Sequence, residues 1–512
     1  MSYHLGLDSS TQSLKGLIID AAAAGTIVAQ MAVNFAKDLP QYQAAYSPSG
    51  DPLEKHGEPL LWVAALDLLF TRMQAEGAPL DRVVGIAGSG QQHGSVYLNS
   101  RAEAILAVLD PARSLIEQLA PALSRQTSPI WMDSSTSAQC AEVSAAIGAR
   151  LQTDTGSPAI ERFTGAQIRK FYQQEPAAYD ATATVHLVSS FMASLLCGSH
   201  APIDYGDAAG MNLLNLHTLT WDPAICEATA PGLLGKLPPA VPTHTVIGKL
   251  SPYFAKYGFS NDVTIAAWTG DNPASLVGTG ATRPGLAVVS LGTSDTFFAV
   301  LDPYRTDPEG CGHVFGNPTG GFMCLTCFKN GSLARERVCE EAGVDWTFFD
   351  VTAFEQTAAG NHGQLALPWF EAEITPPVLT PGLHANFDFA NAAAATRIRA
   401  VIEAQVLSIR VHSQWIGNFE TIRVTGGASR STGILQTLAN VFQATVETIA
   451  VQDSAALGAA MLAAHVIGHH SYADLSRTLA PAIATFTPDP ATGRIYQDLL
   501  DTYLQLEATT KS

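Results

Sequence analysis

Two segments far apart in this chain share one pattern, a small polar turn between two apolar runs. The first is HLGLDSSTQSLKGLII, from His4 to Ile19, and the second is VSLGTSDTFFAVL, from Val289 to Leu301. Each is typical of a β-hairpin, because Gly, Ser, Thr and Asp between apolar runs favour tight turns and positive φ. Such turns expose backbone N–H groups and hydroxyls that suit phosphate oxygens. The pattern indicates either two related halves with a nucleotide between them or two unrelated hairpins.

The length of the chain also favours two halves. At 512 residues it exceeds the roughly 250–300 residues at which a single hydrophobic core stops growing. A strand-like run at Thr26–Val33 precedes a helical stretch at Pro59–Glu76, and this alternation is typical of an α/β domain. The loop-rich stretch Pro231–Pro242 interrupts the alternation. We therefore predict two α/β domains, one over residues 1–246 and one over residues 247–512.

The charge of the chain restricts its partners. The formal net charge is −18, from 46 acidic against 28 basic residues, so long-range repulsion disfavours nucleic acids and anionic membrane surfaces. A phosphate ligand must then be held locally, by backbone N–H groups, helix N-termini and Mg²⁺. We expect small-molecule partners, and a homodimer stays open as one oligomeric state.

The N-terminal residues and the cysteines indicate a cytoplasmic protein. MSYHLGLDSS has neither the basic nor the apolar region of a secretory signal. The apolar stretch Ser454–Gly468 is rich in Ala and Gly and is too short to span a membrane. Seven cysteines, an odd number without a signal, fit a reducing compartment.

Cys324 and Cys327 have the C-x-x-C spacing that zinc sites and redox sites use. A zinc site would need a second ligand pair, and only Cys311, His313 and Cys339 are near in sequence. The apolar, strand-like run around the two cysteines favours reduced thiols buried in a strand over either function.

Two carboxylates, one in each predicted half, are the first candidates for chemistry. Asp271 stands in TGDNPASLVGTG, where a strand ends and a helix is expected from Pro273. Asp8 follows the apolar run HLGL and precedes three hydroxyl residues that end at Thr11. A carboxylate there can hold the water shell of Mg²⁺ while the hydroxyls donate to phosphate. The simpler alternatives are a helix N-cap for Asp271 or Asn272 and a turn residue for Asp8.

Two further loops suit a ligand with flat and hydroxylated parts. In IRVTGGASRSTG, a strand leads through Gly426 and Gly427 into an amphipathic helix, and glycines allow the backbone to approach a flat group closely. In GIAGSGQQHGSVYLN, Gln91, Gln92 and His93 stand between two apolar runs, which suits hydrogen bonds to hydroxyls. A loop histidine satisfied within the protein is the alternative for His93.

In their order along the chain, these segments resemble the FGGY family of carbohydrate kinases, and within it the xylulokinases of eukaryotic type. The segments that carry the resemblance cover nearly the whole chain: Asp8 with its hairpin, GQQHG, WMDSSTSAQC, ERFTGAQIRKFYQQEP, PIDYGDAAGMNLL, TGDNPASLVGTG, SLGTS, CFKNGSLARE and TGGAS. The resemblance implies an α/β fold of two duplicated ribonuclease-H-like domains of the actin-like ATPase type, with a catalytic cleft between them. It also implies phosphorylation of the ketopentose D-xylulose at its C5 hydroxyl by ATP and Mg²⁺, with the two hairpins as phosphate-binding turns.

The resemblance also implies roles for individual residues. Asp271 is the expected catalytic base, and it is a second candidate beside Asp8 for contact with Mg²⁺. The residues expected to contact the sugar are Gln92, His93, Arg162, Asp271 and Asn272. The residues expected on the nucleotide side are Asp8, which positions Mg²⁺ through water, Thr11, Gly292, Thr293, Ser294, Trp346, Gly426, Gly427, Ala428 and Ser431.

The sequence departs from the family pattern in three places. GQQHG has Gln92 where many bacterial members have Met, the Trp-x-Asp-x-Arg of many members ends here in Ser135, and the tetrapeptide Phe-Gly-Gly-Tyr is missing. The first two departures concern the identity of the sugar. The alternatives are therefore a kinase for ribulose, gluconate or a polyol, a non-catalytic sugar or nucleotide sensor, and an actin-like filament or chaperone ATPase. The last leaves GQQHG and ERFTG unexplained.

Overall fold

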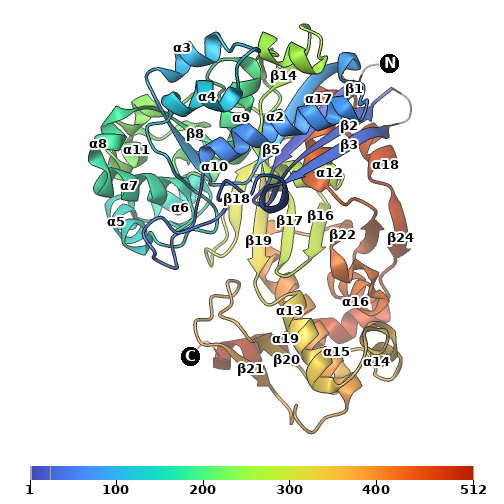
Figure 1. Cartoon of the computed structure of the whole chain (residues 1–512). Coiled ribbons are helices and arrows are strands. Elements are labelled where there is room, and N and C mark those ends of the chain that lie inside the picture. Colours follow the sequence, from blue (N-terminus) through green and yellow to red (C-terminus); the bar gives the residue numbers. More distant parts are fainter. Residues whose placement is uncertain (1–2, 23–24, 511–512) are drawn as a thin grey trace. The chain divides into compact units, whose positions relative to one another are not determined.

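The computed structural model describes residues 3–22 and 25–510, which divide into two compact units (Figure 1). Unit 1 contains the chain up to Thr282 together with Val314–Met323 and Gln452–Ala480. Unit 2 contains Arg283–His313, Cys324–Val451 and the chain from Pro481 onward. The chain therefore passes between the units more than once.

The sheet of unit 1 has the strand order β13-β14-β5-β1-β2-β3, and β15 also pairs with β5. Its strands are β1 (Tyr3–Ser9), β2 (Ser13–Asp20), β3 (Thr26–Asn34), β5 (Val83–Gly90), β13 (Val246–Lys249), β14 (Thr264–Ala266) and β15 (Thr269–Gly270). The pairs β1–β2, β2–β3 and β13–β14 are antiparallel, whereas β1–β5 and β5–β14 are parallel.

The second sheet repeats this arrangement, in the order β18-β19-β17-β16-β22-β23-β24. Its strands are β16 (Leu286–Leu291), β17 (Asp295–Leu301), β18 (His313–Gly316), β19 (Phe322–Phe328), β22 (Thr421–Thr425), β23 (Thr445–Ile449) and β24 (Ala482–Phe486). The pairs β16–β17 and β23–β24 are antiparallel, and β16–β22 and β22–β23 are parallel. The run β2-β1-β5-β14 thus corresponds to β17-β16-β22-β23 in order and direction, so the hairpins belong to two similar halves. The edge strands differ in connection, because β13 precedes β14 in the chain whereas β24 follows β23.

The predicted boundary at residue 246 does not coincide with the division into units. Strand β14 adds to the parallel edge of β5, in the register Thr264 to Gly85, so the residues just after 246 complete the first sheet. This pairing joins segments far apart in sequence, and local composition carries no signal for it. Gln452–Ala480 also belongs to unit 1, although it was expected in the second domain.

Helices pack on the sheets and on one another. In unit 1 they include α2 (Pro59–Ala75), α5 (Ser137–Ile147), α7 (Thr164–Gln174), α9 (Val188–Cys197), α10 (Tyr205–Ala209), α11 (Pro223–Thr229), α12 (Asp271–Gly278), α17 (Ser454–Val466) and α18 (Tyr472–Leu479). In unit 2 they include α13 (Ser332–Ala342), α15 (Ala394–His412), α16 (Thr432–Phe442) and α19 (Pro490–Thr510). The main core of unit 1 lies where β1, β2 and β5 meet α2 and α9, and a core of unit 2 joins α15 to α19.

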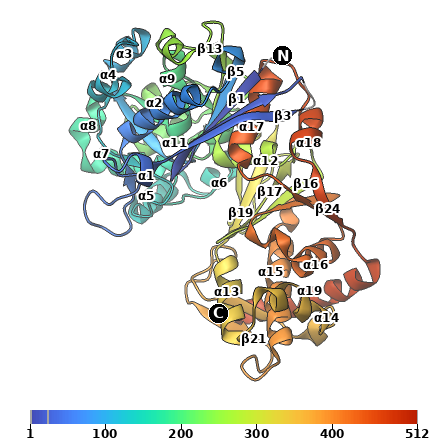
Figure 2. The ribbon, with the colours of Figure 1, turned by 45° about the vertical axis from the view of Figure 1, so that its right-hand side comes forward.

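The apolar stretch near the C-terminus is the buried helix α17. Figures 1 and 2 both show α17, in red, against the blue strands of unit 1. A Cβ atom on Gly6 of β1 would lie 2.1 Å from the carbonyl oxygen of Ala456, so glycine is required by this close packing. The prediction that glycines turn the hairpins through positive φ is wrong, because neither Gly6 nor Gly292 has positive φ. The first hairpin turns at Ser10–Ser13, where the Ser10 amide donates to the Ser13 carbonyl at 3.0 Å.

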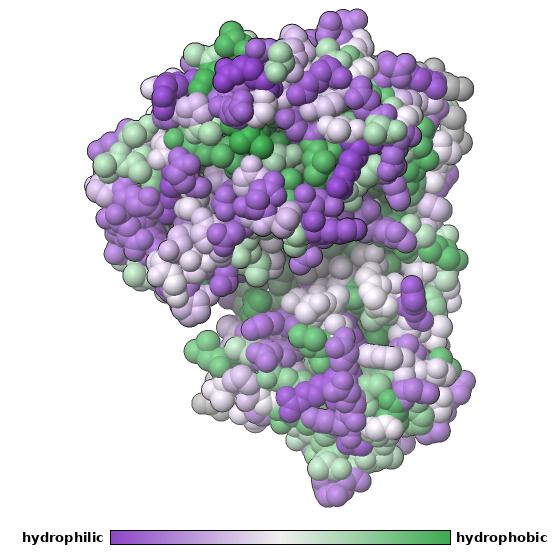
Figure 3. Space-filling model, in the orientation of Figure 1, coloured by the Kyte–Doolittle hydropathy of each residue, from purple (hydrophilic) through white to green (hydrophobic). Residues whose placement is uncertain are grey.

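The surface of each unit carries many hydrophilic residues on the face drawn in Figure 3. Among residues 3–22 and 25–510, no helix combines the length and the apolar character needed to cross a membrane.

Candidate active site

Asp271 is the first residue of α12, directly after strand β15. The N-cap of this helix is Gly270, with no side-chain capping bond, so the N-cap alternative for Asp271 and Asn272 is wrong and the helix begins before Pro273. The partly exposed Asp271 carboxylate accepts from the backbone N–H of Asn272 at 2.9 Å. Burial, and then the negative charge of Asp8, raise the pKa of Asp271 to about 7. A carboxyl group with this pKa is suited to accept a proton near neutral pH.

Asp8 lies near the end of β1 and is 5% exposed. Its Oδ1 accepts from the Ser89 hydroxyl at 2.8 Å. Burial raises the pKa of Asp8 to about 6, and Asp453 adds to the rise, while the Ser89 bond and the charge of Lys15 oppose it. Because the charge of Asp8 acts on Asp271, the two carboxylates occupy one region of unit 1, and the expectation of one carboxylate in each half is wrong.

This pair fits Mg²⁺, which prefers oxygen ligands and keeps several of its waters. In the part of the chain that the structure describes, no group of three or more His, Cys, Asp or Glu side chains is placed to hold a metal ion. A cation at Asp8 or Asp271 would accordingly be bound through one or two carboxylates and would complete its shell with water and phosphate.

Gln92 joins the GQQHG loop to the start of α12. Its Oε1 accepts from the Asn272 amide at 2.8 Å. The Gln92 Nε2 and the Gln91 Oε1 atoms are buried and have no hydrogen-bond partner among the described residues. A donor and an acceptor left unpaired in this way are expected to bind a ligand or water, because an unsatisfied buried polar group is unfavourable by about 1–3 kcal/mol.

His93 is held in a defined tautomer. Its Nδ1 atom lies 2.8 Å from the carbonyl oxygen of Gly210, and since a carbonyl can only accept, Nδ1 carries the proton. Burial, and then the charge of Arg162, lower the pKa of His93 to about 3, so the ring is neutral and Nε2 is a hydrogen-bond acceptor. The ring of Phe163 stacks on it with centroids 4.3 Å apart, and Thr164 donates to the His93 carbonyl at 3.0 Å.

Arg162 follows Glu161, whose backbone carbonyl is held in place by two side chains. The Glu161 carbonyl accepts from Thr136 at 2.5 Å and from the Gln167 amide at 2.9 Å. Gln167 also donates to Asp133 at 2.9 Å. The loop that carries Arg162 is thereby tied to the segment that contains the family's Trp-x-Asp pattern.

Lys170 supplies a cation near the position where the arginine of that pattern is missing. Its ammonium group donates to Ser135 at 2.7 Å and to Glu54 at 3.1 Å. Although Ser135 replaces the arginine of that pattern, Lys170 of α7 therefore supplies this buried cluster with a positive charge.

A model of the FGGY family of carbohydrate kinases, N-terminal domain, matches residues 122–278, and the C-terminal domain model of the same family matches residues 287–467. The chain is 40% identical to the xylulose kinase of Rattus norvegicus, over 98% of this chain and 96% of the relative. It is also 40% identical to xylulose kinase 2 of Arabidopsis thaliana, over 91% of this chain and 87% of the relative. The chain belongs to the FGGY family of carbohydrate kinases.

Solved structures of other kinases share the fold. A xylulose kinase from Rhodospirillum rubrum has a TM-score of 0.84 at 22% identity and covers 99% of this chain and 98% of its own. A gluconate kinase from Lactobacillus acidophilus has a TM-score of 0.84 at 19% identity, over 100% of this chain and 98% of its own. The FGGY family membership makes the chain a phosphotransferase that uses ATP and a carbohydrate.

Of the nucleotide-side residues expected for an FGGY kinase, Asp8 and Thr11 lie in unit 1 and the others lie in unit 2. Gly292, Thr293 and Ser294 connect β16 to β17. Gly426 has a φ of 92°, and a Cβ there would lie 2.4 Å from the carbonyl oxygen of Leu291, so the Gly-Gly loop packs beside the start of that turn. A Cβ on Gly427 would meet nothing within 4 Å, which leaves this face of the loop open.

Ser431 and the segment of Trp346 also lie close together in unit 2. Ser431 caps α16 by accepting from the Ile434 N–H at 3.4 Å. Burial raises the pKa of Asp350, and a hydrogen bond with Ser431 opposes the rise. Trp346 is 48% exposed and its ring contacts Phe349 with centroids 5.2 Å apart. A cavity of about 390 Å³, lined in part by Thr432 and Gly433, lies next to this cluster.

The sequence reasoning missed residues that support these side chains. Ser89, Phe163 and Gly210 contact Asp8 or His93, and the indole N–H of Trp131 donates to the Thr11 hydroxyl at 2.6 Å. All four stand inside or beside motifs that were recognised. Their contacts join segments remote in sequence, so composition and spacing gave no direct signal for them.

The cysteine pair has no further role in this geometry. All seven cysteines lie in the described residues and carry thiols. Cys324 is buried in β19, and burial raises the pKa of its thiol to about 12. A thiol that resists ionisation is a poor nucleophile and a poor metal ligand. This fits the interpretation as reduced thiols in an apolar strand, in which Cys324 is buried and Cys327 is partly buried.

Proposed function

We propose that this chain is a xylulose kinase, which transfers the γ-phosphoryl group of ATP to the C5 hydroxyl of D-xylulose and releases D-xylulose 5-phosphate and ADP. The observation that carries the proposal is the 40% identity to a xylulose kinase over 98% of the chain. A cytoplasmic location, Mg²⁺ as the metal and a homodimer as one oligomeric state belong to the same proposal.

Asp271 is the base in this mechanism. The C5 hydroxyl oxygen forms a bond to the γ-phosphorus while the bond from that phosphorus to the β,γ-bridging oxygen breaks, and the hydroxyl proton passes to the Asp271 carboxylate. The pKa of about 7 leaves a substantial ionised fraction at neutral pH. The bond between its Oδ1 and the Asn272 N–H orients the carboxylate before the substrate arrives.

The sugar is oriented by groups from two loops of unit 1 and from the start of α12. The neutral His93 ring accepts from a sugar hydroxyl at Nε2, because its Nδ1 proton is used by the Gly210 carbonyl. Gln92 donates through its buried, unpartnered Nε2 atom, beside the amide of Asn272. Arg162 adds donors to sugar oxygens, with its backbone fixed by the bonds to Glu161.

The phosphates are held by hydroxyls and backbone N–H groups rather than by a basic patch. Thr11 and the turn Gly292–Ser294 supply these donors, and Asp8 would hold Mg²⁺ through water. Bound Mg²⁺ would reduce the repulsion between the phosphate oxygens and the carboxylates. Gly426, Gly427, Ala428 and Ser431 contact the adenosine, together with Trp346.

The test is a panel of sugars assayed for sugar-dependent release of ADP. The proposal expects D-xylulose to give the largest kcat/KM among xylulose, ribulose, gluconate and glycerol. A preference for another sugar would reject the substrate and retain the kinase. Binding of sugar without turnover would indicate a sensor, and ATP hydrolysis that ignores all sugars would indicate a filament or chaperone ATPase.

A further inference from the structure

A buried ion pair stands directly after the turn Gly292–Ser294 in unit 2. The guanidinium of Arg335 donates to both carboxylate oxygens of Asp295, at 2.7 and 2.9 Å. Each of the two residues is 2% exposed. A paired geometry of this kind fixes both distance and orientation, because the planar guanidinium matches the carboxylate.

The helix that carries Arg335 begins against the same turn. The N–H of Ser332, the first residue of α13, donates to the Gly292 carbonyl at 2.8 Å, and Arg335 Nη2 lies 3.5 Å from that oxygen. A Cβ on Gly331 would lie 2.7 Å from the Thr293 carbonyl oxygen, so only glycine fits there. The turn is therefore held by α13 at both its Gly292 and its Asp295 ends.

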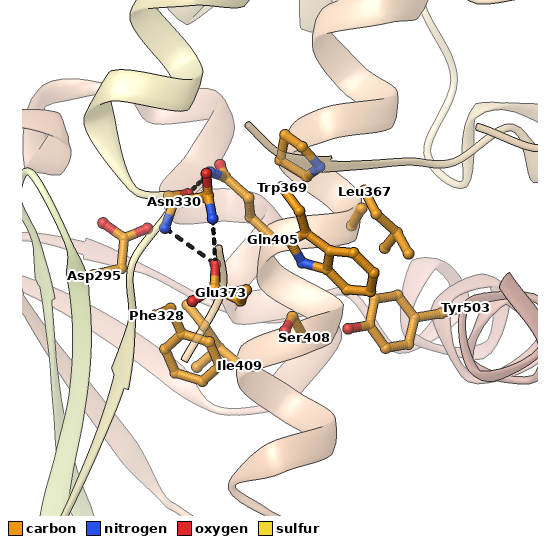
Figure 4. A pocket seen from close by; sticks show the side chains of 12 residues that line it. Asp295, Phe328, Asn330, Leu367, Trp369, Glu373, Gln405, Ser408, Ile409 and Tyr503 are labelled. Atoms are coloured by element: carbon orange, nitrogen blue, oxygen red, sulfur yellow. Dashed lines mark hydrogen bonds between the residues drawn. The ribbon is translucent and has the colours of Figure 1, made fainter. Parts of the chain in front are cut away.

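The ion pair is anchored in turn to α15. Arg335 Nη1 donates to Gln405 at 3.3 Å, and the Gln405 amide donates to the Asn330 carbonyl at 2.7 Å. Asn330 Nδ2 donates to Glu373 at 2.8 Å. Figure 4 shows Asp295, Asn330, Glu373 and Gln405 among the side chains around a cavity. The cavity measures about 20 Å³, enough for roughly one water molecule, so this network supports the turn and is not itself a ligand site.

The positive charge of Arg335 also neutralises the Asp295 carboxylate next to the turn Gly292–Ser294. Asp295 is the residue after Ser294, and the whole chain has a net charge of −18. An unpaired carboxylate one residue from a phosphate-binding turn would repel the phosphates strongly, because buried charges are little screened. The guanidinium cancels that charge through its two bonds to the Asp295 carboxylate.

We propose that Arg335 is a positioning residue for nucleotide binding, which holds the turn Gly292–Ser294 through Asp295 and the Gly292 carbonyl so that the turn's N–H groups keep a fixed orientation toward phosphate. This rests on the role that the proposed function gives to the turn. The segment CFKNGSLARE, which the catalytic assignments left without a role, is thereby explained.

The test compares Arg335→Lys with Arg337→Lys. Lysine keeps the charge at position 335 and loses the paired geometry. Arg337 is the matched control, since it stands on the same helix in an exposed pair with Glu341 at 2.8 Å.

Calorimetry gives the Kd values for ADP with Mg²⁺ and for D-xylulose, and steady-state assays give kcat and both KM values. We expect Arg335→Lys to lower kcat/KM for ATP roughly 10- to 100-fold, the loss typical of a displacement near 1 Å, to weaken ADP binding, and to leave xylulose affinity within about twofold. Arg337→Lys should match the unmodified protein.

A folded Arg335→Lys protein with unchanged ADP affinity and unchanged KM for ATP would overturn the proposal, and so would an equal loss of affinity for sugar and nucleotide. If Arg335→Lys does not fold, the double variant Asp295→Asn with Arg335→Gln decides, because a neutral pair avoids an uncompensated buried charge. It should lose ADP affinity and keep xylulose affinity. If D-xylulose is not the substrate, only the proposal about sugar specificity fails. The measured affinity for ADP still tests the role of Arg335.

Discussion

At the scale of single residues, two buried carboxylates of unit 1 behave in opposite ways. Burial raises the pKa of both, but hydrogen bonds from His56, Ser135 and Gln167 outweigh it at Asp133 and hold its pKa well below the usual range. At Asp271 the effect of burial prevails, the charge of Asp8 adds to it, and the backbone hydrogen bonds from Asn272 and Gln92 only partly oppose it. Asp133 is thus a permanent anion that supports a loop, whereas Asp271 can exchange a proton.

Asp271→Asn tests the proposed base. Asparagine keeps the size of the side chain but cannot take the hydroxyl proton, so kcat should fall by roughly 10²–10⁴ with much less effect on xylulose binding. Turnover by a coupled ADP assay and sugar affinity by calorimetry are measured on one preparation. Near-normal turnover would show that Asp271 is not the base, and Asp8 would be the next carboxylate to test.

His93→Ala tests the sugar side. Removal of the Nε2 acceptor should lower kcat/KM for the sugar by about 1–3 kcal/mol in transition-state stabilisation, while KM for ATP stays within about twofold. Steady-state kinetics with each substrate varied in turn give both values. A rise in KM for ATP at constant KM for the sugar would show that His93 is assigned to the wrong ligand.

At the scale of elements, the crossing of α12 and α17 places the start of α12. A Cβ on Gly278 would lie 1.9 Å from the Ser454 carbonyl oxygen, and one on Gly458 would lie 1.8 Å from that of Ala274. The two helices therefore pack backbone to backbone, in the small-residue segments ASLVG and SAALG. Since α17 also packs on β1, the helix that begins with Asp271 is positioned against the strand that carries Asp8.

Gly458→Ala should disturb this crossing. The methyl group must separate α12 from α17, which is expected to destabilise the protein by about 1–3 kcal/mol and to lower Tm by roughly 2–10 °C, with a drop in kcat because Asp271 moves. Gly235→Ala is the control, since a Cβ there meets nothing within 4 Å. Differential scanning fluorimetry and the ADP assay report the two effects. Equal Tm values for the two variants would contradict the packing argument.

At the scale of the whole molecule, buried titratable groups make stability depend on pH in two opposing ways. Burial lowers the pKa of His4 to about 4, with His470 adding to the shift and Asp20 opposing it. Both ring nitrogens of His4 are buried without a hydrogen-bond partner among the described residues. The raised pKa values of Asp8, Asp204 and Asp271 act in the other sense, because neutral carboxyls are easier to bury.

His4→Leu isolates the histidine contribution. The pKa of His4 in the folded state lies below the unfolded value of about 6.5, so the unfolded chain binds more protons between these values. Stability is then complete above pH 6.5 and is lost as the pH falls toward 4. At pH 5 the loss should be about 2 kcal/mol, and His4→Leu should remove it. Thermal unfolding of both proteins from pH 8 to pH 5 is the measurement, and parallel Tm curves would contradict the assignment.

The sequence by itself determined the elements and the residue types of the site. Turn residues, apolar runs and helical periodicity are local properties, so the hairpins, the helix at Pro59–Ala75 and the loops that carry His93, Asp271 and Gly426 could be predicted. Tertiary structure decided what depends on contacts between remote segments. The pairing of β14 with β5 moved the boundary of the first unit, the approach of α17 explained Gly6, and the Gly210 carbonyl selected the tautomer of His93. The ion pair of Arg335 with Asp295 is of the same kind, because two residues 40 positions apart meet only when α13 packs on the turn.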